Sequence, residues 1–229
     1  MRSVRIAPGE YYHLFNRGAG KQIIFKDRAD RVRFLFLVIF FQSDLNFPNL
    51  GRDIKQFLNF GQHSVLTKEG QSKAHEVIIR RSVELISFSL MPNHFHILVK
   101  EIEEDGIAVY MQRVLNSYTK YFNTKYEKSG HLFQGPYGAV HVEDNEQILY
   151  LSAYIHRNPR ELKEWFGKED LYEWSSYSDF LRENRFGDLL MPDIITGQFK
   201  NKDKYKEFVA TNTSKLLESE LGGVFIDLY

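Results

Sequence analysis

Two apolar segments separated by a Pro-Asn pair constrain the fold more than any other feature of this sequence. Residues 82–90 (SVELISFSL) and 94–100 (HFHILVK) each have the composition and period of a strand. The connection between them, MPNHF, is short enough for a tight hairpin. The sequence therefore predicts an antiparallel pair of strands near its middle.

The second strand of this hairpin carries two histidines in an apolar run. Alternate side chains of a strand face opposite sides of the sheet, so one face is apolar and is formed by Phe95, Ile97 and Val99. His94 and His96 share the other face with Leu98. Adjacent imidazoles on one face are well placed to hold a metal ion. Two half-exposed histidines on a sheet surface would show the same spacing, so the pattern alone leaves both interpretations open.

The segments around the hairpin predict a β-α-β-β-α-β order. Further strands are expected at residues 10–18 and 136–142, and helices at 27–41, 107–129 and 143–159. Asp27 is a plausible N-cap for the first helix, Gly130 is expected to end the second, and Asp144 with Gln147 resembles a capping box for the third. This order is that of an α+β fold of the ferredoxin-like split βαβ type, with an antiparallel sheet.

Two regions fall outside this pattern. Residues 42–75 have weak periodicity and are expected to form an irregular insertion with one short helix near 52–60. The C-terminal region contains the segment EWSSYSDFL and a charged helix near 200–219. We therefore expect a catalytic domain over residues 1–180 and a helical C-terminal extension over 181–229.

Composition limits the classes of protein. The chain of 229 residues contains no cysteine, which excludes disulfides and thiolate zinc sites. Its longest apolar run, FLFLVIFF, is too short to span a membrane, and residues 1–10 do not resemble a signal peptide. We expect a soluble, cytoplasmic protein with no membrane partner.

The overall charge is zero, but its distribution is uneven. Residues 1–33 carry eight basic and three acidic side chains, and residues 110–130 carry four basic and one acidic. Tyrosine and phenylalanine are interleaved with these basic groups, as in proteins that contact phosphates and stack on unpaired bases. A solvated surface over ordinary core aromatics would have the same composition.

The last predicted helix of the domain carries a polar stripe. Tyr150, Tyr154 and Asn158 recur every four residues and therefore share one side of the helix. In the split βαβ arrangement this helix can cross the sheet face that bears His94 and His96. One metal ion would then take both histidines and Asn158, with Tyr154 one turn away. An ordinary helix surface would show the same stripe.

Several motifs, in order from about residue 10 to 180, resemble a known family. They are YYHLFNRG, LMPNHFHILVK, SYTKYFNTKYEKSGHLFQGPYGAV, YIHRNP and WSSY. Together they are similar to the REP-associated tyrosine transposases, a branch of the single-tyrosine HUH transposases of the IS200-like superfamily. Pro136 departs from the family pattern, in which a basic residue usually occupies this position.

The resemblance implies a metal-dependent enzyme that cleaves and transfers single-stranded DNA. Tyr154 would be the nucleophile that forms a 5′-phosphotyrosine, and His94, His96 and Asn158 would hold Mg²⁺ or Mn²⁺. The expected partners are DNA hairpins of repetitive palindromic elements. Candidate DNA contacts are Arg17, Lys21, Arg113, Lys120, Lys125, Gln134 and Tyr137.

Two other functions share these motifs. One is a domesticated protein that binds single strands without cutting them, and the other is a phosphodiesterase in which the metal activates water. His75, His131, His141 and His156 are also able to reach a metal or phosphate, although each fits a structural or solvent-facing role. Both a monomer and a homodimer are compatible with the sequence, and we favour the monomer because the C-terminal region can cover a sheet edge.

Overall fold

The computed structural model describes residues 5–58 and 68–211. Four antiparallel strands form its central sheet in the order β2-β3-β1-β4. Their bounds are β1 Tyr11–Arg17, β2 Val83–Met91, β3 His94–Glu101 and β4 Gly138–Val142. One helical crossover follows β1 and another follows β3, which confirms the predicted ferredoxin-like α+β fold.

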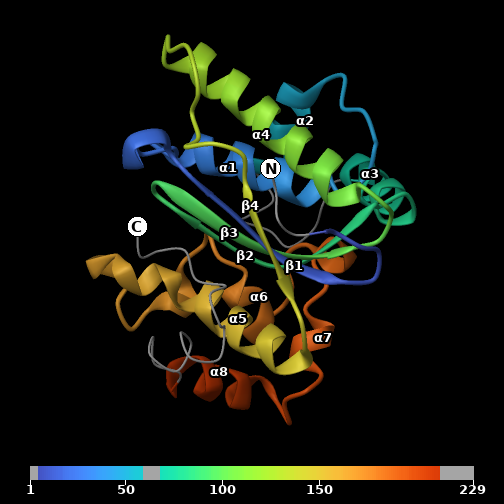
Figure 1. Ribbon diagram of the computed structural model, residues 1–229, viewed down its shortest axis with the longest axis vertical. Helices are drawn as coiled ribbons and strands as arrows, with labels where there is room; N and C mark the ends of the chain where they lie inside the picture. Colours follow the sequence, from blue (N-terminus) through green and yellow to red (C-terminus); the bar gives the residue numbers. More distant parts are fainter. Residues whose placement is uncertain (1–4, 59–67, 212–229) are drawn as a thin grey trace.

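Helices cover both faces of the sheet (Figure 1). One face is covered by α1 (Arg28–Phe40) and α4 (Gly106–Lys125), with α2 (Leu50–Leu58) and α3 (Lys68–Ile79) beside them. The opposite face is covered by α5 (Asn145–Arg157), with α6 (Tyr177–Leu181) and α7 (Asp193–Thr196) beside it, and α8 (Lys202–Thr211) packs on the side of α5 that faces away from the sheet. Each face has its own apolar core, and we call the two sides the α4 face and the α5 face.

Capping explains where α1 and α5 begin. Asp27 accepts a hydrogen bond from the Asp30 amide at 3.0 Å, and the Asp30 carboxylate accepts one from the Asp27 amide at 3.3 Å, which confirms the predicted cap. Asp144 likewise accepts from the Gln147 amide at 2.8 Å. The Gln147 side chain accepts instead from the amide of Glu143, one residue earlier than a capping box requires.

Two sequence predictions were wrong in detail. The region 42–75 is not an irregular insertion with a single helix, because α3 (Lys68–Ile79) follows α2 and buries Ala74 and Val77. Helix α4 ends at Lys125 rather than at Gly130. Glu127 takes a left-handed conformation (φ 51°) just after that end, a role usually given to glycine.

The segment after α5 covers the outer edge of β2. The amide of Leu90 donates to the Trp174 carbonyl at 2.9 Å, and the amide of Ser176 donates to the Phe88 carbonyl at 3.0 Å. Further along the chain, the Met191 amide donates to the Leu85 carbonyl at 2.8 Å. These bonds occupy an edge that would otherwise be open to pairing with another chain.

Helix α8 occupies the first half of the predicted 200–219 helix, and residues 212–219 lie outside the described residues. Across residues 5–58 and 68–211, no helix combines the length and apolar character needed to cross a bilayer.

Candidate active site

The two histidines of β3 lie on the α5 face of the sheet. His94 and His96 are both buried, and their ring centroids are 5.1 Å apart in a T-shaped arrangement. Between them Phe95 points the other way and packs in the core of the α4 face. The predicted alternation is therefore confirmed, and the pair is enclosed rather than exposed on a sheet surface.

A third histidine, His13, belongs to the same group. Strand β1 pairs with β3 so that Phe15 lies opposite His96 and His13 lies one step further along the same face. The Nε2 atom of His13 is 2.9 Å from Nδ1 of His96, and the two rings are stacked. Sequence reasoning missed His13. The sequence places His13 and Phe15 on the same face of the first strand, but only the pairing register of β1 with β3 shows that His13 meets His96.

A glycine in β4 allows the site to be covered. Phe15 lies opposite Gly138 in the sheet, and a Cβ atom at Gly138 would be 1.9 Å from the Phe15 ring. The absence of a side chain therefore lets this ring lie across β4. The ring reaches within 5.1 Å of the His13 ring and 6.5 Å of the His96 ring, measured between centroids. Gly138 thus helps to enclose the histidines.

Helix α5 brings Tyr154 and Asn158 to the same place. Tyr154 is 8% exposed, and its ring is T-shaped to His96 at 5.2 Å and to His13 at 6.1 Å. Asn158 is the C-cap of α5 and the first residue of a short 3-10 turn (Asn158–Glu161). Tyr150 lies one turn before Tyr154 but packs against Phe208 of α8, so only part of the predicted stripe reaches the histidines.

Asn158 contacts His94 directly. The amide nitrogen of Asn158 donates to the Tyr154 carbonyl at 3.3 Å, and its Oδ1 lies 3.2 Å from Nε2 of His94. The other ring nitrogen of His94, Nδ1, lies 2.7 Å from Oδ1 of Asn93. Both nitrogens of the ring therefore face amide oxygens. A neutral imidazole has only one N–H, so one of these pairs joins two acceptors unless a proton or a cation is present.

These residues fit a divalent cation. With Nδ1–H donated to Asn93, the Nε2 lone pair of His94 points to the Asn158 oxygen, and both atoms are suitable ligands. His13 accepts the Nδ1–H of His96 in the matching tautomer, which leaves Nε2 of His96 as a ligand. Among the described residues no group of three His, Cys, Asp or Glu side chains is arranged for a metal, so a cation held by His94 and His96 would take the Asn158 oxygen as a further ligand.

His156 is a structural residue between Tyr154 and Asn158. Its Nδ1 atom is 2.7 Å from the Tyr205 hydroxyl of α8, and its Nε2 atom is 2.8 Å from the Ser176 hydroxyl. Ser176 also accepts the Phe88 amide of β2 at 2.9 Å. Burial lowers the pKa of His156 to about 3, so the ring is neutral. The motifs YIHRNP and WSSY therefore meet in a network that fixes α5 against β2 and α8.

Two of the predicted DNA contacts lie beside the histidines. Arg17 and Gln134 line a cavity of 390 Å³ together with His94 and His96. The backbone amide of Gln134 donates to the Arg17 carbonyl at 2.8 Å, which holds the two residues together. Lys21 lies on the short turn after β1, where its carbonyl accepts a hydrogen bond from Asn93 at 3.4 Å. These three residues therefore lie near the histidines, and their contact with a phosphate stays a prediction.

The remaining predicted contacts belong to the α4 face. Arg113 donates to the carbonyls of Ser43 and Leu45, and Lys125 of α4 forms ion pairs with Asp27 and Asp30 at the start of α1. Tyr137 is buried in the core of this face. Lys120 is exposed and lines a separate groove. The structure therefore divides the predicted contacts into two groups, and their roles in DNA binding stay predictions.

The fold and site define a class of protein: a ferredoxin-like domain with a buried centre of histidine, asparagine and tyrosine side chains. Residues 61–158 match the family model described as IS200-like transposases. The family resemblance seen in the motifs is thus confirmed, and it supports a transposase function. The matched segment begins after β1, although β1 lies between β3 and β4 in the sheet.

Comparison with solved structures identified a REP-associated tyrosine transposase bound to a REP hairpin. It has 13% sequence identity and a TM-score of 0.43, and the similarity covers 85% of this chain and 93% of that one. None of the curated proteins matches the chain.

Proposed function

We propose that this protein cleaves and rejoins single-stranded DNA with the Tyr154 hydroxyl as nucleophile. The observation that carries the proposal is the convergence of Tyr154 and Asn158 from α5 on His94 and His96 from β3. A buried tyrosine beside a set of cation ligands suits attack on a phosphodiester, whose negative charge a cation offsets.

The proposed cleavage step uses the tyrosine oxygen as nucleophile and consumes no water. The Tyr154 oxygen forms a bond to phosphorus, and the bond from phosphorus to the 3′ oxygen breaks. The tyrosine proton is lost, and the departing oxygen takes up a proton to give a free 3′-OH. The other fragment stays attached as a 5′-phosphotyrosine. Phenol ionises near pH 10, far below an alcohol, so tyrosinate is also a competent leaving group and a 3′-OH can reverse the step.

His94, His96 and Asn158 would hold Mg²⁺ or Mn²⁺ in this proposal. When bound, the cation supplies charge that polarises the phosphate and holds it in line with the tyrosine. His13 fixes the orientation and tautomer of His96 through the 2.9 Å contact between their rings. His156 and Ser176 hold α5 in place, which sets the position of both Tyr154 and Asn158.

Substrate binding is assigned to the basic and polar groups around this centre. Arg17 and Gln134 line the same cavity as the histidines, and Lys21 lies nearby on the turn after β1. The motif resemblance to REP-associated transposases supports a DNA hairpin with an unpaired flank as the substrate.

A monomer is supported by two observations. The side chains of the centre all come from one chain, namely His13, His94, His96, Tyr154 and Asn158, and the outer edge of β2 is covered by the chain's own C-terminal segment. Light scattering after size exclusion tests this, and a stable dimer would contradict it.

An adduct assay tests the proposed reaction. Labelled hairpin DNA from the protein's own genomic flanks is incubated with the protein and Mn²⁺ and run on a denaturing gel. We expect a covalent shift that disappears in Tyr154→Phe. Tyr150→Phe is the matched control, because Tyr150 lies one turn away on the same helix and packs against Phe208.

The other outcomes separate the competing functions. Cleavage without a covalent shift would favour a phosphodiesterase that uses water. Tight binding of the DNA with neither product would favour a protein that binds single strands without cutting them. A shift that persists in Tyr154→Phe would place the nucleophile on another residue.

A further inference from the structure

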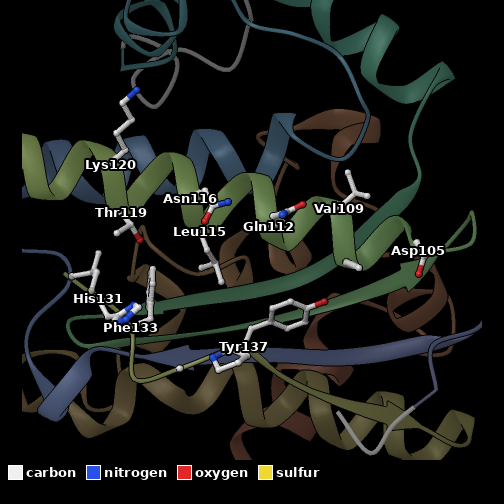
Figure 2. A pocket seen from close by; sticks show the side chains of 14 residues that line it. Asp105, Val109, Gln112, Leu115, Asn116, Thr119, Lys120, His131, Phe133 and Tyr137 are labelled. Carbon is white, nitrogen blue, oxygen red and sulfur yellow. The ribbon is translucent and has the colours of Figure 1, made fainter. Parts of the chain in front are cut away.

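A groove on the α4 face has no role in the proposed reaction. It has a volume of 1010 Å³ and lies between α4 and the segment 131–137 that leads into β4. Figure 2 shows side chains of α4 along one wall and His131, Phe133 and Tyr137 along the other. The groove therefore lies outside the centre formed by His94, His96, Tyr154 and Asn158.

The α4 wall presents polar groups in a row. Gln112, Asn116 and Thr119 recur at helical spacing and point into the groove from one side of α4 (Figure 2). Gln112 and Asn116 are exposed, although they lie beside the apolar side chains of Leu115 and Phe133. The wall thus combines exposed amides with apolar surface.

Few ionisable side chains line the groove, and they lie toward its two ends. Lys120 and His131 lie toward one end, and Asp105 lies at the other (Figure 2). The centre carries neutral amides and a hydroxyl. Amide side chains pair with the edges of bases, and aromatic and apolar surfaces accept the faces of bases. A surface that followed only the phosphate backbone would need more cations. The lining therefore suits unpaired bases.

The groove is continuous with the candidate active site. Gly135 and Pro136 line both the groove and the 390 Å³ cavity that contains His94 and His96. Both residues are exposed, so this short segment forms a low wall between the two spaces. A strand whose phosphate lies at the histidines can therefore pass over Gly135 and Pro136 and continue into the groove.

We infer that the groove holds unpaired nucleotides of the strand that is cleaved, and that Gln112 and Asn116 read their bases. This inference rests on the proposed function, because it takes its ligand from the strand at Tyr154. It assigns sequence recognition to the α4 face and chemistry to the α5 face, with the segment 134–136 between them.

Selection from a random-sequence pool of single-stranded DNA tests this inference without relying on cleavage. The experiment uses the Tyr154→Phe protein, so that bound DNA is not consumed, and compares it with the same protein carrying Gln112→Leu and Asn116→Leu. Gln71→Leu is the matched control, because Gln71 is an exposed helical amide that does not line either cavity. Sequencing of the bound fraction gives the base preference at each position.

We expect the parent and the Gln71→Leu control to enrich particular bases, and the groove variant to lose that enrichment by about tenfold. Equal base preferences in all three proteins, or no preference in the parent, would overturn the inference. Asn116→Asp serves as a second variant of the same shape if the double variant does not fold, and it should also change the preferred base. Failure of the proposed reaction appears separately, as the absence of an adduct with unmutated Tyr154.

Discussion

The two faces of the sheet use similar side chains in opposite ways. On the α4 face, basic and tyrosine side chains have acidic partners. Lys125 pairs with Asp27 and Asp30, and the Tyr126 hydroxyl donates to Asp30 at 2.7 Å. On the α5 face, the ring nitrogens of His94 both meet amide oxygens, so a proton or cation is needed to complete the contacts. The two faces therefore differ in the balance of hydrogen-bond donors and acceptors more than in the kinds of side chain they contain.

The same contrast appears in the electrostatics. Burial and the hydrogen bond to Asp30 raise the pKa of Tyr126 to about 12, which keeps the phenol protonated and structural. Although partial burial opposes it, contact with the Lys125 ammonium lowers the pKa of Asp27. The cluster of Asp27, Asp30, Lys125 and Tyr126 is thus held by opposite charges that match at neutral pH. Four predictions test this division.

The largest expected effect is on the α5 face. His94→Ala should slow formation of the tyrosine adduct on the order of 1000-fold, because it removes a cation ligand worth several kcal/mol to the reaction. Binding of Mn²⁺, measured by calorimetry, should be lost as well, while binding of single-stranded DNA is largely kept. His141→Ala is the control, since His141 lies at the sheet edge and pairs with Glu10. An equal loss of DNA binding and cleavage would mean that His94 organises the fold instead.

The next effect concerns the residue that supports His96. His13→Phe should weaken Mn²⁺ binding about 10- to 100-fold, because it removes the acceptor that holds the ring and tautomer of His96. His13→Gln retains an acceptor and should restore part of the affinity. Calorimetric titration with Mn²⁺ measures both variants. Unchanged Mn²⁺ affinity in His13→Phe would show that the contact between the two rings is only a packing contact.

A third prediction concerns acid stability on the α5 face. The folded pKa of His156, about 3, lies below its ordinary value near 6.5, so its contribution is complete above that value and falls as the pH drops. We expect the protein to lose about 2 kcal/mol of folding free energy between pH 6.5 and 5. Denaturant titrations should show this slope in the wild type and a flatter one in His156→Gln. A wild type whose stability is constant over this range would contradict a buried, neutral His156.

The smallest effect belongs to the α4 face. Lys125→Met should cost about 1 kcal/mol of stability, because it removes an ion pair from the partly exposed cluster around Asp30. The affinity for single-stranded DNA should not change, since the ammonium is already engaged within the protein. Thermal melts and fluorescence anisotropy measure the two quantities. A clear loss of DNA affinity at constant stability would restore Lys125 as a DNA contact.

Local signals in the sequence were sufficient where the interaction is local. The hairpin around Pro92 and Asn93, the cap at Asp27 and the alternation around His94 depend on neighbours in the chain, and the structure has them as predicted. Helix α3 was missed because its periodicity is weak and its stability comes from burying Val77 against other elements. The end of α4 was misplaced because Glu127 takes the left-handed conformation that we expected of Gly130.

The sequence by itself determined the β-α-β-β-α-β order of the main elements, the common face of His94 and His96, and the resemblance to IS200-like transposases, whose family model matches residues 61–158. Only the tertiary structure showed that His13 contacts His96 and that Lys125 is engaged in ion pairs. It also showed that Tyr154 packs against His96, whereas Tyr150 packs against Phe208. The physical reason is that periodicity fixes which side of an element a residue occupies. Strand register and helix packing decide which residues of different elements meet there.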